Sequence, residues 1–64
     1  MKNDIQSCLE VAQKIDGLEQ DVTSWEADYL DSILKRLRSG VKLTEKQFQV
    51  LEGMAEKYLP EEDR

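Results

Sequence analysis

Two capping boxes on either side of a glycine place the strongest constraint on the fold. Thr23 and Glu26 form the first box, T-x-x-E, and Thr44 and Gln47 form the second, T-x-x-Q. In a capping box, two side chains satisfy backbone N–H groups at the start of a helix. Gly40 lies between the boxes, and glycine ends helices by taking the left-handed conformation. The segment therefore predicts a helix that ends near Gly40 and a second helix that starts after Thr44.

Apolar residues repeat with a helical period on both sides of this glycine. Over 24–38 they cover an arc of about 180°, wider than the ~100° stripe of an ordinary surface helix. We therefore expect helices over about 24–38 and 45–59, the second ending before Pro60. Because both ends of the short connection are specified, the two helices are expected to form a tight antiparallel hairpin.

A third helix is predicted over about 4–16, where five apolar residues fall on one face. Asn3 is the expected N-cap and Gln6 its capping-box partner, while Gly17 is expected to end the helix in the left-handed conformation. The polar link "GLEQD" leaves open that this helix is a detachable arm. The sequence thus predicts an all-α, three-helix single domain over 1–64, with a polar, frayed tail over 60–64.

The amino-acid composition argues against several kinds of functional site. The chain has no histidine and a single cysteine, Cys8, so an internal disulfide is excluded and a zinc or histidine-based site is not expected. Cys8 lies on the apolar stripe of 4–16 and is expected in the core. We expect no catalytic residues, no cofactor and no metal, and therefore no enzyme. The longest apolar runs are far short of a membrane span, so a cytoplasmic protein without a membrane partner is expected.

Charge is distributed unevenly along the chain. Residues 35–46 carry five bases and one acid, although the whole chain has a net charge of -5. The cations are a candidate surface for a partner or for nucleic acid, or they stabilise the end of the helix over 24–38 through its dipole. Nucleic acid is not favoured, because proteins that grip duplex DNA are usually basic overall. The five cations are Lys35, Arg36, Arg38, Lys42 and Lys46.

Apolar side chains supply a second candidate surface. Helical spacing places Trp25 and Tyr29 one turn apart, where aromatic residues are usually core but can also stack nucleic-acid bases. The candidate apolar contact surface is completed by Leu34, at one edge of the apolar arc over 24–38, and by Val50, near the side of the helix over 45–59 opposite its main apolar stripe. Gly53 in mid-helix is explained either by a close helix contact or by simple tolerance.

The pattern W-E-x-D-Y-L-D-S-I, followed by G-x-x-L-T-x-K-Q-x-x-V-L-E, resembles a short helical hairpin of phage- and plasmid-borne proteins of DNA replication and recombination. The resemblance implies a phage-like or mobile-element accessory module without a catalytic role. This chain lacks the zinc-binding cysteines that often accompany the hairpin. The matching residues are Trp25, Tyr29, Leu30, Ser32, Ile33, Gly40, Leu43, Thr44, Lys46, Gln47 and Leu51.

The function predicted from these observations is that of a small helical interaction protein. We expect it to bind and modulate a protein partner in nucleic-acid metabolism or host defence, and self-association into a homo-oligomer is compatible with the same surfaces. The first alternative is a nucleic-acid-binding accessory domain that uses the five cations. The second is an acidic mimic of nucleic acid, although acids on the polar sides of helices are ordinarily a solvated surface.

Overall fold

The computed structural model describes residues 1–18 and 22–63. They form the α-helices α1 (Ile5–Asp16), α2 (Ser24–Arg38) and α3 (Glu45–Tyr58), followed by a short 3-10 helix, η1 (Glu61–Asp63). The predicted helices over about 4–16, 24–38 and 45–59 are confirmed to within one residue at each end. Residues 19–21, which belong to the predicted polar link, and Arg64 in the predicted tail lie outside the described residues.

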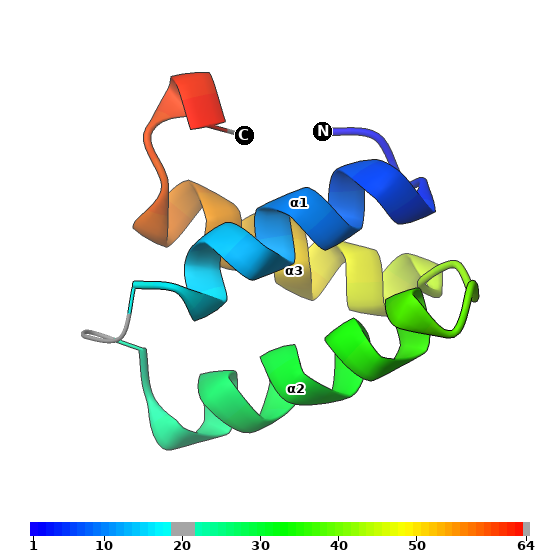
Figure 1. Cartoon of the computed structure of the whole chain (residues 1–64). Helices are drawn as coiled ribbons and strands as arrows, with labels where there is room; N and C mark the ends of the chain where they lie inside the picture. Colours follow the sequence, from blue (N-terminus) through cyan, green and yellow to red (C-terminus); the bar gives the residue numbers. More distant parts are fainter. Residues whose placement is uncertain (19–21, 64) are drawn as a thin grey trace.

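Helix α1 is the centre of the fold, and it lies against both α2 and α3 (Figure 1). Cys8, Ala12 and Ile15 on α1 each have 0% of their surface exposed. Cys8 and Ala12 are small, so the neighbouring helices can approach α1 closely. The hypothesis that this helix is a detachable arm is therefore wrong, while the prediction that Cys8 is a core residue is confirmed.

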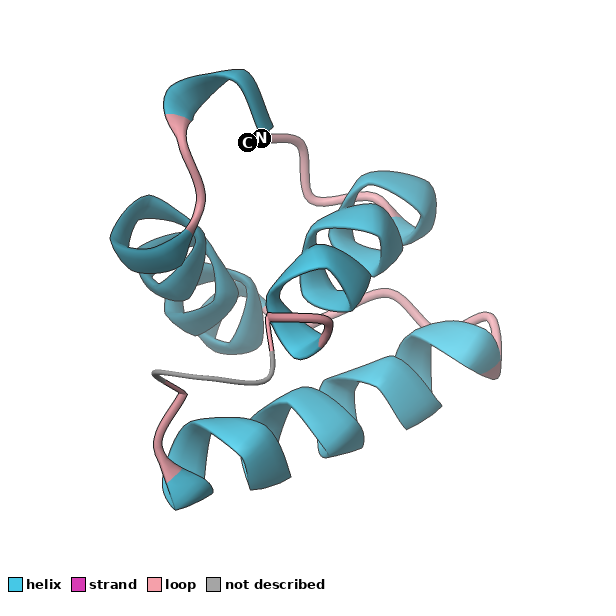
Figure 2. Ribbon diagram, turned by 60° about the vertical axis from the view of Figure 1, so that its left-hand side comes forward, coloured by secondary structure: helices cyan, strands magenta, loops and turns pink. Residues whose placement is uncertain are grey.

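The arrangement of the other two helices differs from the sequence prediction. Figure 2 shows α1 and α3 lying across α2, and the main helix contacts among the described residues join α1 to α2 and α1 to α3. The fold therefore does not rest on the tight α2–α3 hairpin that the short connection predicted. All three helices contribute to one buried apolar core, which consists of Cys8, Val11, Ala12, Ile15, Leu30, Ile33, Leu34, Leu37, Leu43, Leu51, Met54, Ala55 and Leu59.

Both predicted capping boxes are present. The Thr23 hydroxyl accepts from Glu26 N at 3.1 Å, and the Glu26 carboxylate accepts from Thr23 N at 3.0 Å. Thr44 and Gln47 make the same reciprocal pair, at 3.1 and 3.0 Å. Two of the N–H groups that lack a partner within each helix are thereby satisfied.

The corner between α2 and α3 is also as predicted. Gly40 has a φ of 81°, in the left-handed region. Its N–H donates to the Leu37 carbonyl at 2.9 Å, and the Val41 N–H donates to the Arg36 carbonyl at 3.1 Å. This pair of bonds is the Schellman motif, which ends a helix and fixes the direction of the chain that follows.

The two ends of α1 are not capped as predicted. Asp4, and not Asn3, is the N-cap, because its carboxylate accepts from Ser7 N at 2.7 Å. The Asn3 amide instead donates to the Leu43 carbonyl at 3.5 Å, close to the start of α3. Gly17 has a φ of -76° and continues the right-handed conformation, so the left-handed stop expected there is wrong.

The polar tail is more ordered than its composition predicted. Residues Glu61–Asp63 form η1, and Asp63 lies 3.7 Å from the Lys14 ammonium on α1. The N-terminal segment and η1 lie on the side of α1 and α3 away from α2 (Figure 1). The described part of the tail over 60–64 is therefore folded into a turn, in which Asp63 N donates to the Pro60 carbonyl at 2.9 Å, and the frayed tail that was predicted is not seen there.

Replacing Gly53 with alanine is expected to raise the free energy of unfolding by about 0.5–1 kcal/mol. A Cβ at this position would have no atom within 4 Å, so the explanation by a close helix contact is wrong and the glycine is merely tolerated. Gly40→Ala is the matched contrast and should cost about 1–2 kcal/mol, because a side chain is strained at a positive φ. Urea unfolding of both variants measures the difference; a destabilised Gly53→Ala protein would contradict the prediction.

Candidate functional site

Trp25 and Tyr29 form an exposed aromatic pair at the start of α2. Their ring centroids are 5.2 Å apart and their planes differ by 14°, so the rings are stacked. Trp25 is 60% exposed, whereas Tyr29 is half-buried against the core. Burial raises the pKa of the Tyr29 hydroxyl. The expectation that Trp25 is a core residue is therefore wrong: it stands at the exposed edge of the apolar arc, with its ring stacked on Tyr29.

The other two residues of the predicted apolar surface do not join this pair. Leu34 is 4% exposed and belongs to the buried core, because the apolar arc of α2 faces α1 along this part of the helix. Its assignment to a contact surface is therefore wrong. Val50 is half-buried on α3 and lies outside the core cluster.

The five predicted cations gather at the turn between α2 and α3, and we call them the basic corner. Lys35, Arg36 and Arg38 occupy the last turn of α2, where the helix dipole favours positive charge. Lys42 and Lys46 flank the start of α3, where the dipole favours negative charge. Stabilisation of the end of α2 therefore explains the positions of the three cations on that helix, but not those of Lys42 and Lys46.

Two cations of the basic corner already have partners. The Lys35 ammonium lies 3.1 Å from the Asp31 carboxylate in an exposed pair, and Arg36 Nε donates to the Lys42 carbonyl at 2.9 Å. The field of the corner also reaches α1. A hydrogen bond from Ser7 N–H is the main cause that lowers the pKa of Asp4, and the charges of Lys2 and Lys42 lower it further.

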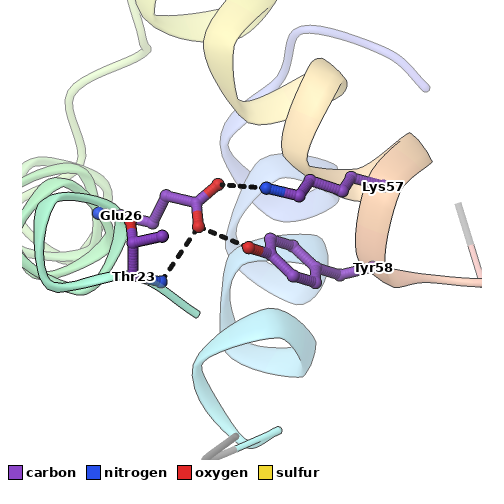
Figure 3. A network of polar contacts seen from close by, with 4 residues as sticks. All are labelled: Thr23, Glu26, Lys57 and Tyr58. Carbon is purple, nitrogen blue, oxygen red and sulfur yellow. Dashed lines mark hydrogen bonds and ion pairs between the residues drawn. The ribbon is translucent and has the colours of Figure 1, made fainter. Parts of the chain in front are cut away.

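A polar network joins the start of α2 to the end of α3 (Figure 3). Glu26 is 7% exposed, and its carboxylate accepts from Thr23 N and from the Tyr58 hydroxyl, while the Lys57 ammonium lies 3.6 Å away. The hydrogen bond from Tyr58 is the main cause that lowers the pKa of Glu26, and the same bond raises the pKa of Tyr58. Both oxygens of the Glu26 carboxylate therefore have partners, and the network joins α2 to α3.

Sequence reasoning found only half of this network. The T-x-x-E box identified Glu26 as a capping residue, but nothing in the local sequence relates it to Tyr58, which lies 32 residues further along the chain. The Tyr58 hydroxyl donates to Oε1, the oxygen that also accepts from Thr23 N, and the second oxygen faces the Lys57 ammonium. A carboxylate has more acceptor positions than a capping box uses, and this spare capacity is the one signal that could have suggested a further partner.

Two shallow hollows lie beside the terminal segments, with volumes of about 250 and 220 Å³. Met1 lines both, and carboxylates of the helices and of η1 supply much of the remaining wall. Among residues 1–18 and 22–63, no group of three potential ligand side chains is arranged to hold a metal ion. The lining of both hollows is therefore mainly acidic, in contrast to the aromatic pair at the start of α2.

Nothing in the described part of the chain forms a helix with the length and apolar character needed to cross a membrane. Comparison with protein-family models, with curated proteins and with solved structures found no match for the chain.

Proposed function

We propose that this protein is a small, non-enzymatic interaction module that binds a protein partner through the aromatic pair. The observation that carries the proposal is the 60% exposure of Trp25 on a body of only 64 residues. Tryptophan and tyrosine are the residues that most often dominate the binding energy of protein interfaces. Stacking on Tyr29 holds the indole in place, so little side-chain entropy is lost when a partner covers it.

The surroundings of the pair support a protein partner over nucleic acid. Asp28 is exposed one turn after Trp25, and it would repel a phosphate backbone next to the rings. Arg36 lies eleven residues beyond Trp25, about 16 Å along the helix at the usual rise of 1.5 Å per residue. Base stacking on Trp25 with phosphate contacts at the basic corner would therefore require a strand to cross the acidic side chain.

The hairpin resemblance indicates the process in which the partner acts. A phage-like or mobile-element accessory module would bind and modulate a protein of nucleic-acid metabolism or of host defence. Binding of nucleic acid by the basic corner is the alternative, supported by the exposed Arg38, Lys42 and Lys46. Because the chain as a whole carries a charge of -5, such binding would be confined to that corner.

Trp25→Ala is expected to abolish capture of partner proteins from a lysate of the cells in which the protein occurs. Capture by the wild-type protein and by Leu18→Ala, which truncates a different exposed apolar side chain, should be equal. Nuclease treatment of the lysate separates the alternatives, because capture that depends on nucleic acid disappears. If Trp25→Ala captures the same proteins as the wild type, the aromatic pair is not the binding surface.

A further inference from the structure

One side of helix α2 carries aromatic and charged residues at equal spacings before and after Ser32, which lies near the middle of the helix. Residues three, four and seven positions before and after Ser32 share one side of an α-helix. All seven are exposed or half-buried, and we call them the outer face of α2. They are Trp25, Asp28, Tyr29, Ser32, Lys35, Arg36 and Ser39.

The two halves of the outer face are complementary to each other. The acid Asp28 lies four positions before Ser32, and the base Arg36 lies four positions after it. The aromatic residue Tyr29 lies three positions before Ser32, and a second base, Lys35, lies three positions after it. A two-fold rotation through Ser32 exchanges the halves, so it would place each acid opposite a guanidinium and each ring opposite an ammonium.

We propose that the outer face of α2 binds the same face of a second copy of the chain, with the two helices antiparallel about an axis at Ser32. This rests on the proposed function, because it names the first partner of the surface that carries the aromatic pair. A two-fold contact of this kind is closed and gives a dimer. The small side chain of Ser32 lets the helix backbones approach at the axis, and antiparallel helices also oppose their dipoles favourably.

Two exposed apolar side chains at opposite ends of α2 fit the same arrangement. Trp25 stands at the start of the helix with 60% of its surface exposed, and Val41 follows the end of the helix with 43% exposed. An antiparallel copy brings the start of one α2 to the end of the other. Each Trp25 would thus lie near Val41 of the second copy, and both side chains would lose contact with water.

The contacts within one chain leave the charged groups of this face able to pair. Within the described residues, the Asp28 carboxylate makes no ion pair, and Arg36 uses only Nε, which donates to the Lys42 carbonyl. That bond leaves the terminal guanidinium nitrogens for the carboxylate of a second copy. The pair between Lys35 and Asp31 is exposed and contributes little, so it does not hold Lys35 away from Tyr29 of the second copy.

Charge reversal tests the arrangement by sedimentation equilibrium. The wild-type chain of 7.4 kDa is expected to reach twice that mass as its concentration rises. Asp28→Arg alone and Arg36→Asp alone should each weaken the dimer by about tenfold or more, because each places like charges opposite each other. An equimolar mixture of the two variants should dimerise again, since the heterodimer pairs every acid with a base.

Arg38→Asp is the matched control, because it makes the same charge change six positions from Ser32 and off the outer face. It should leave the dimer at wild-type strength. A mixture that stays monomeric, or an Arg38→Asp variant as weak as Arg36→Asp, would overturn the proposed pairing. Circular dichroism of each variant verifies that the helices remain.

A cross-link provides a second test that does not depend on charge. Ser32→Cys should form a disulfide between two copies under mild oxidation, because the two-fold axis places residue 32 opposite itself. Ala27→Cys, which is exposed on another side of α2, should not cross-link at a comparable rate. Cys8 is buried and remains unchanged in both proteins. Equal rates at the two positions would show that the outer face does not meet its copy.

The outcomes separate this inference from the proposed function. A wild-type chain that stays monomeric while Trp25 is still required for capture of other proteins rejects the second copy and retains the interaction module. A dimer that Trp25→Ala leaves unchanged, together with capture that Trp25→Ala also leaves unchanged, rejects the role of the aromatic pair.

Discussion

Ile15→Ala is expected to unfold most of the protein at room temperature. Ile15 is fully buried on the central helix α1, in the core that all three helices share. Removing such a side chain costs about 2–5 kcal/mol, which includes the cavity left behind. A single domain of this size has a total stability of roughly 3–5 kcal/mol, so the loss is comparable with the whole.

Circular dichroism and urea unfolding measure this effect. Leu18→Ala removes an exposed apolar side chain just after the same helix, and it should change the free energy of unfolding by less than about 0.5 kcal/mol. Retention of full helicity by Ile15→Ala would contradict the central position of α1. It would instead support a two-helix body with α1 as an arm.

Glu26→Gln is expected to destabilise the protein at neutral pH and to reduce its sensitivity to acid. Glu26 Oε1 accepts from Thr23 N and from the Tyr58 hydroxyl, and an amide oxygen can keep both bonds, as Gln47 does in the second capping box. The substitution removes the charge that strengthens these bonds and the ion pair with Lys57, so the destabilisation should not exceed that of Thr23→Ala, which removes one capping bond and costs about 1 kcal/mol. Urea unfolding at about pH 7 compares the two variants with the wild type.

The direction of the pH effect follows from the lowered pKa of Glu26. Because the folded-state pKa lies below the ordinary value of 4.5, the stabilisation is complete above that value and is lost as the pH falls through the folded-state pKa. The wild type should therefore lose more stability than Glu26→Gln between about pH 7 and about pH 3. The lowered pKa of Asp4 leaves the variant some acid sensitivity. Equal losses in both proteins would show that Glu26 is not engaged as described.

Features encoded by a few neighbouring residues could be predicted from the sequence. The capping boxes at Thr23 and Thr44 and the left-handed Gly40 each depend on residues within one turn, so the helix boundaries followed from them. Gly17 shows the limit of such reasoning, because it resembles Gly40 in sequence but keeps a right-handed conformation. A glycine permits the left-handed stop without requiring it.

Features that depend on how the helices meet could not be predicted. The short connection suggested that α2 and α3 form the main pair, but the small side chains of Cys8 and Ala12 let α1 pack against both. The exposure of Trp25 and the burial of Leu34 follow from this packing, because the position of α1 decides which part of the apolar arc of α2 is covered. The link from Glu26 to Tyr58 depends on the same arrangement.

The burial of Cys8 makes the reactivity of its thiol a measure of how often the protein opens. Its thiol is 0% exposed, and burial raises its pKa, so a reagent that attacks thiolates cannot reach it in the closed fold. The Cys8 thiol lies against the Lys2 carbonyl and the Asn3 side chain, so its labelling requires the N-terminal segment or a neighbouring helix to move away. The labelling rate under native conditions thus reports how often the protein opens around Cys8, and a ligand that binds only the closed form lowers that rate.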